Sequence, residues 1–272
     1  MRIGLFSSGY KRYPLEKVFQ DVKAFGYDYI ELWGGRPHAY PYDMDEKTIA
    51  ETLKLVEKYQ KPIEVYTPEL NEYPYNFMVE DDKMKKDAIG YVKQAVWVGK
   101  QLKAKYVLIS AGHGGNWRSY EDLNNQMIDS LTEIAEYAGQ CKQHLILEAL
   151  TPFESNICNR AEEINYYIEK IKSPYLHGMC DVVPAFVQHQ PIEDYFFHLK
   201  SELRHFHLVD SDGVSDMHIL PGDGKIPLVQ LAAMLKGKNY QNSLTIELVS
   251  AYINEPSLYA GLAIERLKEL GY

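Results

Sequence analysis

Residues 205–213 read His-Phe-His-Leu-Val-Asp-Ser-Asp-Gly, and the rest of the chain is organised around this stretch. Apolar residues interleave with two imidazoles and then give way to carboxylates and a glycine, as happens where a buried strand opens into a loop. Because side chains alternate along a strand, we expect His205 to point to the other face and to be structural. His207 is the first candidate for a functional site.

Three other apolar runs each end in a single carboxylate. They are residues 145–148, 177–181 and 244–247, which end in Glu148, Asp181 and Glu247. An ionised side chain at the end of a buried strand is costly unless it is paired, hydrogen-bonded or bound to a metal. Any one of these residues alone reads as a structural ion pair, but four polar residues at successive strand ends favour one shared site.

Short apolar runs alternate with longer stretches of helical period along the whole chain. We expect strands at 2–7, 29–33, 62–66, 106–109, 145–148, 177–181, 205–209 and 243–248, and helices at 14–22, 48–59, 83–103, 120–141, 161–171, 192–203, 228–235 and 258–270. Eight such units predict an α/β fold, a (β/α)8 TIM barrel that spans residues 1–272 as a single domain. The alternative, an open doubly wound sheet, would want a glycine-rich GxGxxG turn, and residues 7–10 read Ser-Ser-Gly-Tyr.

Catalytic groups of such barrels lie at the carboxyl ends of the strands. Glu148, Asp181, His207 and Glu247 close the fifth to the eighth strand, so they should converge on one side of the mouth. The two glutamates would approach a ligand from different sides, which suits a reaction with two proton-transfer groups. Three carboxylates and one imidazole form a hard ligand set for Mn²⁺, Co²⁺, Ni²⁺ or Mg²⁺, whereas zinc more often binds more nitrogen or sulfur.

Composition narrows the partners. The chain carries 29 Lys and Arg against 38 Asp and Glu, a formal net charge of -9, which argues against nucleic acid and for a small or metal-neutralised substrate. No run approaches the roughly 18 apolar residues of a membrane span, and residues 1–6 read as a strand and not as a signal peptide, so we expect a cytoplasmic protein without a membrane partner. The three cysteines lack CxxC spacing and are expected to be reduced thiols.

Three loops hold further candidates. Residues 66–77 crowd aromatic and polar side chains where a barrel enzyme keeps its substrate walls, although an aromatic contact between subunits fits equally. His113 follows the fourth strand on a glycine-rich loop and is ambiguous. The acidic loop with Asp210, Asp212, Asp216 and His218 lacks the EF-hand pattern, and a second metal, a substrate contact and a solvated turn stay open for it. Residues 221–225, Pro-Gly-Asp-Gly-Lys, read as a tight turn with a weak signal for phosphate.

These features carry a resemblance to a known family. The chain resembles the sugar 3-epimerase branch of the xylose isomerase-like TIM barrels. Besides the Glu/Asp/His/Glu set, the motifs that carry the resemblance lie at residues 30–38, 66–69, 73–76, 150–156, 207–213 and 254–256, and they span nearly the whole chain. The runs Trp-Gly-Gly-Arg-Pro-His and Asp-Ser-Asp-Gly narrow it to the fructoselysine type.

The resemblance implies a metal-dependent reaction at C3 of a 2-keto sugar or Amadori product, converting fructoselysine to psicoselysine through a cis-enediolate. Glu148, Asp181, His207 and Glu247 would bind a divalent metal, and Glu148 and Glu247 would also serve as the acid/base pair. Substrate contacts are expected from Glu154, Tyr66, Glu69, Arg36, Asn76, His113 and His218. The substrate would be a small sugar or a glycated amino acid, and relatives commonly form homo-oligomers.

One departure from the family pattern concerns the far end of the substrate. Free-ketose 3-epimerases usually carry a histidine three residues after the aspartate ligand and an arginine beyond the histidine ligand, whereas this chain has Pro184 and a loop rebuilt around Asp216 and His218. A free-ketose 3-epimerase and an inosose-dehydratase-like lyase stay as alternatives. An endonuclease IV-like hydrolase fits less well because the chain is acidic and offers few histidines, and a non-catalytic sugar-binding barrel would not need two opposed glutamates.

Overall fold

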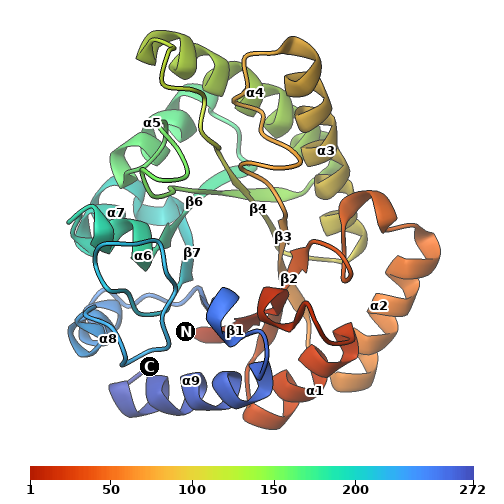
Figure 1. The fold of residues 1–272 in the computed structure, drawn as a ribbon, viewed down its shortest axis with the longest axis vertical. Helices are drawn as coiled ribbons and strands as arrows, with labels where there is room; N and C mark the ends of the chain where they lie inside the picture. Colours follow the sequence, from red (N-terminus) through yellow and green to blue (C-terminus); the bar gives the residue numbers. More distant parts are fainter.

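The computed structural model describes residues 1–272, and its eight parallel strands close into a barrel in chain order, with β8 pairing back onto β1. The central barrel and its surrounding helices are visible in Figure 1. The predicted (β/α)8 TIM barrel is confirmed. The strands are β1 (Arg2–Phe6), β2 (Tyr29–Gly34), β3 (Ile63–Pro68), β4 (Tyr106–Ser110), β5 (His144–Glu148), β6 (Leu176–Asp181), β7 (Leu203–His207) and β8 (Ser243–Ile246).

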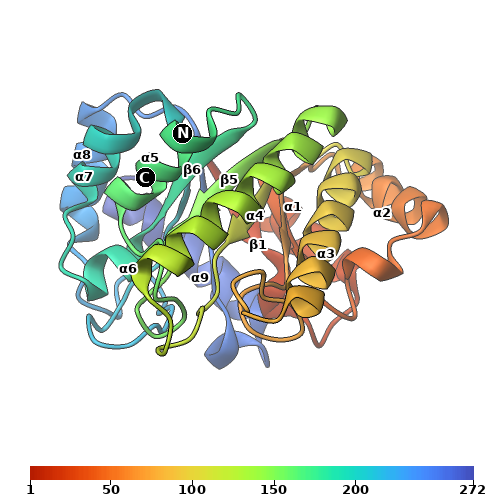
Figure 2. The same cartoon turned by 90° about the horizontal axis from the view of Figure 1, so that it is seen from above.

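Helices form the outer layer, as the view from above shows in Figure 2. Several begin at a polar residue whose side chain accepts a hydrogen bond from a backbone N–H of the first turn, as Asp45, Asp81 and Ser119 do. No helix is both long and apolar enough to cross a membrane. The helices are α1 (Leu15–Phe25), α2 (Glu46–Tyr59), α3 (Asp82–Gln101), α4 (Tyr120–Cys141), α5 (Ala161–Ile171), α6 (Val182–Val187), α7 (Ile192–Leu199), α8 (Leu228–Gly237) and α9 (Pro256–Leu270).

A small apolar cluster supports the site from below. Its members Ile146 and Met179 each precede a candidate residue by two positions, Glu148 and Asp181, so alternation along the strand places them on the same inward face one layer down. The much larger main core packs the outward strand faces against the helices. The inward cluster consists of Val65, Tyr106, Leu108, Ile146 and Met179.

The structure corrects three local expectations. His205 shares the inward face with His207, because residues two apart on a strand point the same way, so its predicted outward position was wrong. Strand β7 begins at Leu203, since the helix expected to reach that residue ends at Leu199 and a 3-10 turn follows. Helix α6, directly after Asp181, was not predicted, and Pro184 lies in its first turn, where proline is tolerated.

Candidate active site

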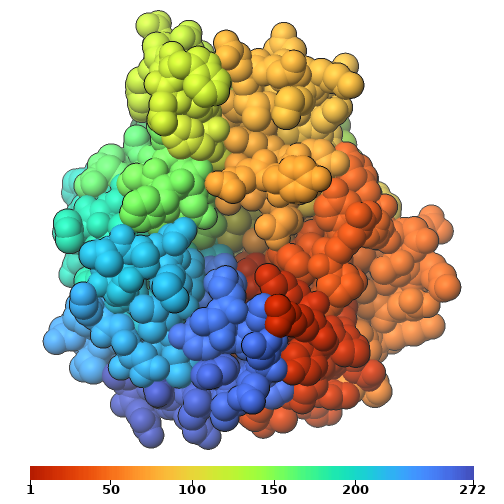
Figure 3. Space-filling model, viewed as in Figure 1, coloured from red at the N-terminus to blue at the C-terminus, as the bar shows by residue number.

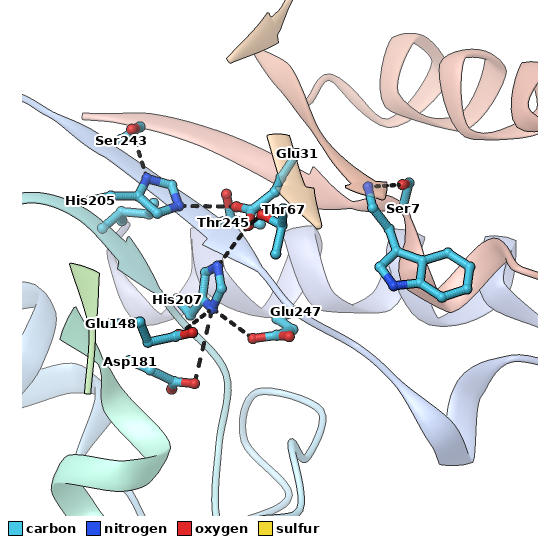
Figure 4. A network of polar contacts seen from close by, with 12 residues as sticks. Ser7, Glu31, Thr67, Glu148, Asp181, His205, His207, Ser243, Thr245 and Glu247 are labelled. Atoms are coloured by element: carbon cyan, nitrogen blue, oxygen red, sulfur yellow. Dashed lines mark hydrogen bonds and ion pairs between the residues drawn. The ribbon is translucent and has the colours of Figure 1, made fainter. Parts of the chain in front are cut away.

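The four polar residues at the ends of β5 to β8 come together at one imidazole nitrogen. The Nδ1 atom of His207 lies 3.1 Å from Oε1 of Glu148 and 2.7 Å from Oε2 of Glu247. The nearest carboxylate oxygen of Asp181 is 4.0 Å from the same nitrogen. Figure 4 shows the three carboxylates approaching the ring from different strands. The barrel thus assembles the set that the strand ends suggested.

His207 is held from behind by a residue that sequence reasoning overlooked. Its Nε2 atom lies 2.9 Å from Oε1 of Glu31, a fully buried glutamate on β2. Glu31 also contacts Nε2 of His205 at 3.0 Å and accepts the hydroxyl hydrogen of Thr67 at 2.6 Å. The available signal was a lone carboxylate inside an apolar strand, Tyr29-Ile30-Glu31-Leu32, at an inward position.

The geometry around Nδ1 of His207 suits a shared cation. This nitrogen is buried and makes no hydrogen bond, although two carboxylate oxygens lie within 3.1 Å of it. The oxygens therefore lie off the direction in which an N–H would donate, as ligands do when they surround a common centre. Glu148, Asp181 and His207 bring donor atoms close enough to share one cation, and Asp181, His218 and Glu247 do so beside them. Carboxylate oxygens together with an imidazole nitrogen are donors that fit a divalent cation.

The electrostatics of the site are strongly coupled. Burial raises the pKa of Glu148 to about 7, and the charges of Asp181 and Glu247 add to this while His207 opposes it. Burial disfavours ionisation of Glu247 as well, but the charges of His207 and His218 outweigh it and hold its pKa below the usual value. Burial likewise opposes protonation of His207, yet Glu247, Glu31 and Glu148 raise its pKa well above the ordinary value. A positive charge at the centre of the pocket, from a proton or a cation, therefore stabilises the buried carboxylates.

His218 completes the site from the loop after β7. Its Nε2 atom lies 2.9 Å from Oδ2 of Asp181 and 3.2 Å from Oε2 of Glu247. The loop is held by buried Asp210, whose carboxylate accepts backbone N–H bonds from Ser211, Gly222, Gly224 and Ile226. The Pro-Gly-Asp-Gly-Lys turn therefore binds an anion that belongs to the chain itself. Asp216 is exposed, and Asp212 accepts hydrogen bonds from within its own turn.

A cavity of about 270 Å³ opens above the four strand-end residues. Figure 3 shows this face recessed where segments of the N-terminal, middle and C-terminal chain meet. Glu69 and Glu154 lie along its wall, and Glu69 accepts the indole N–H of Trp33 at 2.5 Å. Pro184 and His218 also line it. The lining holds five carboxylates against one lysine, Lys11, so it is strongly acidic.

Four expected substrate contacts lie outside this cavity lining. Tyr66 is buried and its hydroxyl donates to the carbonyl of Ala39. Arg36 pairs with Asp43 at the surface. The amide of Asn76 donates to the carbonyl oxygen of His113, whose Nδ1 accepts the N–H of Gly115, so both residues shape loops. These four side chains are Tyr66, Arg36, Asn76 and His113.

Only the first part of the aromatic segment 66–77 forms the cavity wall, and its later aromatic residues pack behind that wall. Tyr75 stacks on Tyr91 of α3 with ring centroids 4.0 Å apart, and Phe77 is fully buried. The wall comes from residues 67–71, and the aromatic part of the lining comes from Trp33 on β2 and Phe6 on β1. Trp33 belongs to the Trp-Gly-Gly-Arg-Pro-His run but was not named as a substrate contact, and Lys11 carried no signal, because a lysine in a loop is common.

Comparison with known proteins identifies the family of this chain. The family model described as "Xylose isomerase-like TIM barrel" matches residues 19–270. The chain is 42% identical over 270 residues to fructoselysine 3-epimerase of Shigella flexneri, covering 99% of this chain and 98% of that protein. The chain belongs to the xylose isomerase-like TIM barrel family.

The chain is also similar to more distant sugar 3-epimerases. D-psicose 3-epimerase of Enterocloster bolteae is 24% identical over 244 residues, which cover 85% of this chain and 76% of that protein. The structure of D-psicose 3-epimerase with D-tagatose from Clostridium cellulolyticum H10 superposes with a TM-score of 0.81 at 16% identity, covers 99% of each chain and shows the same fold. By its close relatives the chain is an epimerase, an enzyme of the isomerase class.

Proposed function

We propose that this epimerase inverts C3 of a 2-keto sugar that carries an amine at C1, converting fructoselysine to psicoselysine. The observation that carries the proposal is the placement of two glutamates, Glu148 and Glu247, on strands three steps apart around one imidazole nitrogen. Inversion at a carbon next to a carbonyl needs one group to remove a proton and a second to return one to the opposite face. The site offers such a pair at rigid strand ends.

The donor set would hold a divalent cation such as Mn²⁺, Co²⁺, Ni²⁺ or Mg²⁺ through Glu148, Asp181, His207 and Glu247. When bound, such a cation supplies the Lewis acidity that polarises a ketone. One glutamate then takes the C3 proton, which leaves an enediolate, and the other donates a proton from the opposite face. Because both carboxylates stand on strand ends, their orientation is already fixed before the substrate arrives.

The acidic wall supports a substrate with a positive charge. Glu69 and Glu154 line the cavity beyond the four proposed metal ligands and are not needed to hold a cation there. The secondary amine of an Amadori product is protonated near neutral pH and is attracted to such carboxylates, whereas a free ketose is neutral. Pro184, which lines the same cavity, offers no hydrogen bond donor from its side chain. These features favour the Amadori product over a free ketose.

Proton NMR of fructoselysine in D2O tests the proposal. Purified protein would be supplied with Mn²⁺, Co²⁺ or Ni²⁺, and a sample with excess chelator serves as the control. We expect metal-dependent exchange of the C3 proton for deuterium together with the appearance of a second diastereomer. Exchange with psicose, fructose or tagatose but not with fructoselysine would reject the substrate and keep the reaction, and no exchange with any of them would reject both.

A further inference from the structure

We propose that Glu31 is a positioning residue that sets the tautomer and the orientation of His207. The inference rests on the metal-dependent function proposed above. Glu31 is fully buried on β2 and lies at the centre of a polar layer beneath the four strand-end residues. Figure 4 shows it on the side of the His207 ring opposite to Glu148, Asp181 and Glu247. Glu31 does not itself line the cavity, but it contacts two residues that do, Thr67 and His207.

The contacts of Glu31 leave one tautomer for the neutral ring of His207. An ionised carboxylate only accepts hydrogen bonds, so Nε2 of His207, 2.9 Å from Oε1 of Glu31, must carry the hydrogen. When His207 gives up its other proton to bind a cation, its lone pair therefore lies on Nδ1, which is the nitrogen that the three carboxylates surround. A carboxylate behind a ligating imidazole also makes the ring a stronger donor to a cation.

His205 and Thr67 hold Glu31 in place. His205 lies 3.0 Å from the second oxygen of Glu31 through Nε2, and its Nδ1 lies 2.9 Å from the hydroxyl of Ser243. Thr67 donates its hydroxyl hydrogen to Oε1 at 2.6 Å. With His207, three donors therefore converge on the two oxygens of one carboxylate, which restricts its rotation. The inward position of His205 thus allows its ring to hold the second oxygen of Glu31.

The cost of burying this network argues for a role beyond filling space. On β3 to β6 the cluster of inward side chains beneath the site is apolar, as with Ile146 and Met179, and Met179 pairs with His205 in the strand register. An apolar filling of similar volume is often as stable as a buried charged network, or more so. The charged residues, Glu31 and His205, lie directly beneath His207, where they orient this proposed metal-binding residue.

Substitution of Glu31 by glutamine provides the test. In Glu31→Gln the amide oxygen can still accept from His207 and Thr67, while the amide NH2 can face His205 if that ring moves its hydrogen to Nδ1 and donates to Ser243. The variant should therefore fold while it lacks the negative charge. Glu64→Gln is the matched control, because Glu64 is a buried glutamate on β3 whose carboxylate pairs with Arg2 away from the site.

Titration with Co²⁺, followed by calorimetry and by the visible spectrum of the bound ion, gives a readout that needs no turnover. We expect the Kd of Glu31→Gln to rise about 10- to 100-fold, with a changed Co²⁺ spectrum, and that of Glu64→Gln to stay within about threefold of the wild type. A folded Glu31→Gln with wild-type affinity and spectrum would overturn the inference. Failure of the wild type itself to bind Co²⁺ would instead refute the proposed metal-dependent function.

A measurement on the unmodified chain keeps the inference testable if Glu31→Gln does not fold. Long-range proton–nitrogen NMR of Zn²⁺-loaded wild-type protein with labelled histidines reports which ring nitrogen carries hydrogen. We expect the signal that disappears in His207→Asn to belong to a ring protonated at Nε2 and not at Nδ1. Protonation of His207 at Nδ1 would overturn the inference.

Discussion

The Nδ1 atom of His207 lies 2.7 Å from Oε2 of Glu247, and the two make no hydrogen bond. Oε1 of Glu148 lies 3.1 Å from the same nitrogen. Glu148 ends β5, which is three strands away from β8, the strand that leads to Glu247. The imidazole and the two glutamates are therefore arranged around a point in front of the ring and not along a donor direction. Either glutamate can therefore be replaced by mutation to test its role in the site.

Conservative substitution of either glutamate should remove turnover while the fold persists. Glu148→Gln and Glu247→Gln keep the side-chain shape but abolish the proton-transfer group, so we expect kcat for epimerisation to fall by at least about 100-fold. The exposed Glu121→Gln on α4 is the control. Circular dichroism would check the fold and NMR the rate, and near-normal epimerisation by either variant would rule out the two-base scheme.

Glu69 should distinguish charged from neutral substrates. It lines the outer part of the cavity, where its carboxylate is held by Trp33. We expect Glu69→Gln to lower kcat/KM for fructoselysine about tenfold more than kcat/KM for psicose, because only the former carries an ammonium group. Glu72→Gln, an exposed residue of the same loop outside the cavity lining, should affect both equally. An equal loss for both substrates in Glu69→Gln would contradict this role.

Asp210 should be the residue that keeps the loop of His218 folded. Its buried carboxylate accepts four backbone N–H bonds, and an amide in its place has only one oxygen to accept them. We expect Asp210→Asn to lower the free energy of unfolding by about 3 kcal/mol, since buried donors lose a charged acceptor. Asp216→Asn on the exposed part of the loop should change it by less than about 0.5 kcal/mol. Urea unfolding of both variants measures the difference, and equal stabilities would refute the assignment.

His177 should make the fold sensitive to acid. Burial lowers the pKa of His177 below the usual value for histidine, although Glu202 opposes the shift, and burial also lowers the pKa of its neighbour His144. Both rings titrate near pH 6.5 once the chain unfolds. Below that pH the unfolded chain binds protons that the folded chain resists, so stability should fall as the pH drops from about 7 to 5.

Urea unfolding at pH 7.5, 6.5 and 5.5 would follow this loss of stability. In His177→Asn the slope of unfolding free energy against pH should become shallower over that range, because one of the buried groups that resist protonation is gone. His198→Asn, at the last turn of α7, serves as the control. A slope in His177→Asn as steep as that of the wild type would show that other groups set the acid sensitivity.

Local patterns along the chain were enough to predict the barrel and the four strand-end residues. A mainly apolar strand with a carboxylate as its last residue or directly after it indicates where the functional end of the strand lies, and β5, β6 and β8 each show this feature. The alternation of side chains along a strand, applied correctly, would have placed His205 beside His207. These features depend on neighbours within a few residues, which is the range over which a sequence can be interpreted.

Only the tertiary structure decided which loop residues face the cavity and what lies beneath the site. Thr67 lines the cavity, while the adjacent Tyr66 packs outside it. His218 enters the site, while Asp210 of the same loop accepts hydrogen bonds from backbone N–H groups. Glu31 meets His207 across 176 positions of sequence, because closure of the barrel brings β2 opposite β7. Such contacts depend on chain closure and long-range packing, which no local pattern of residues encodes.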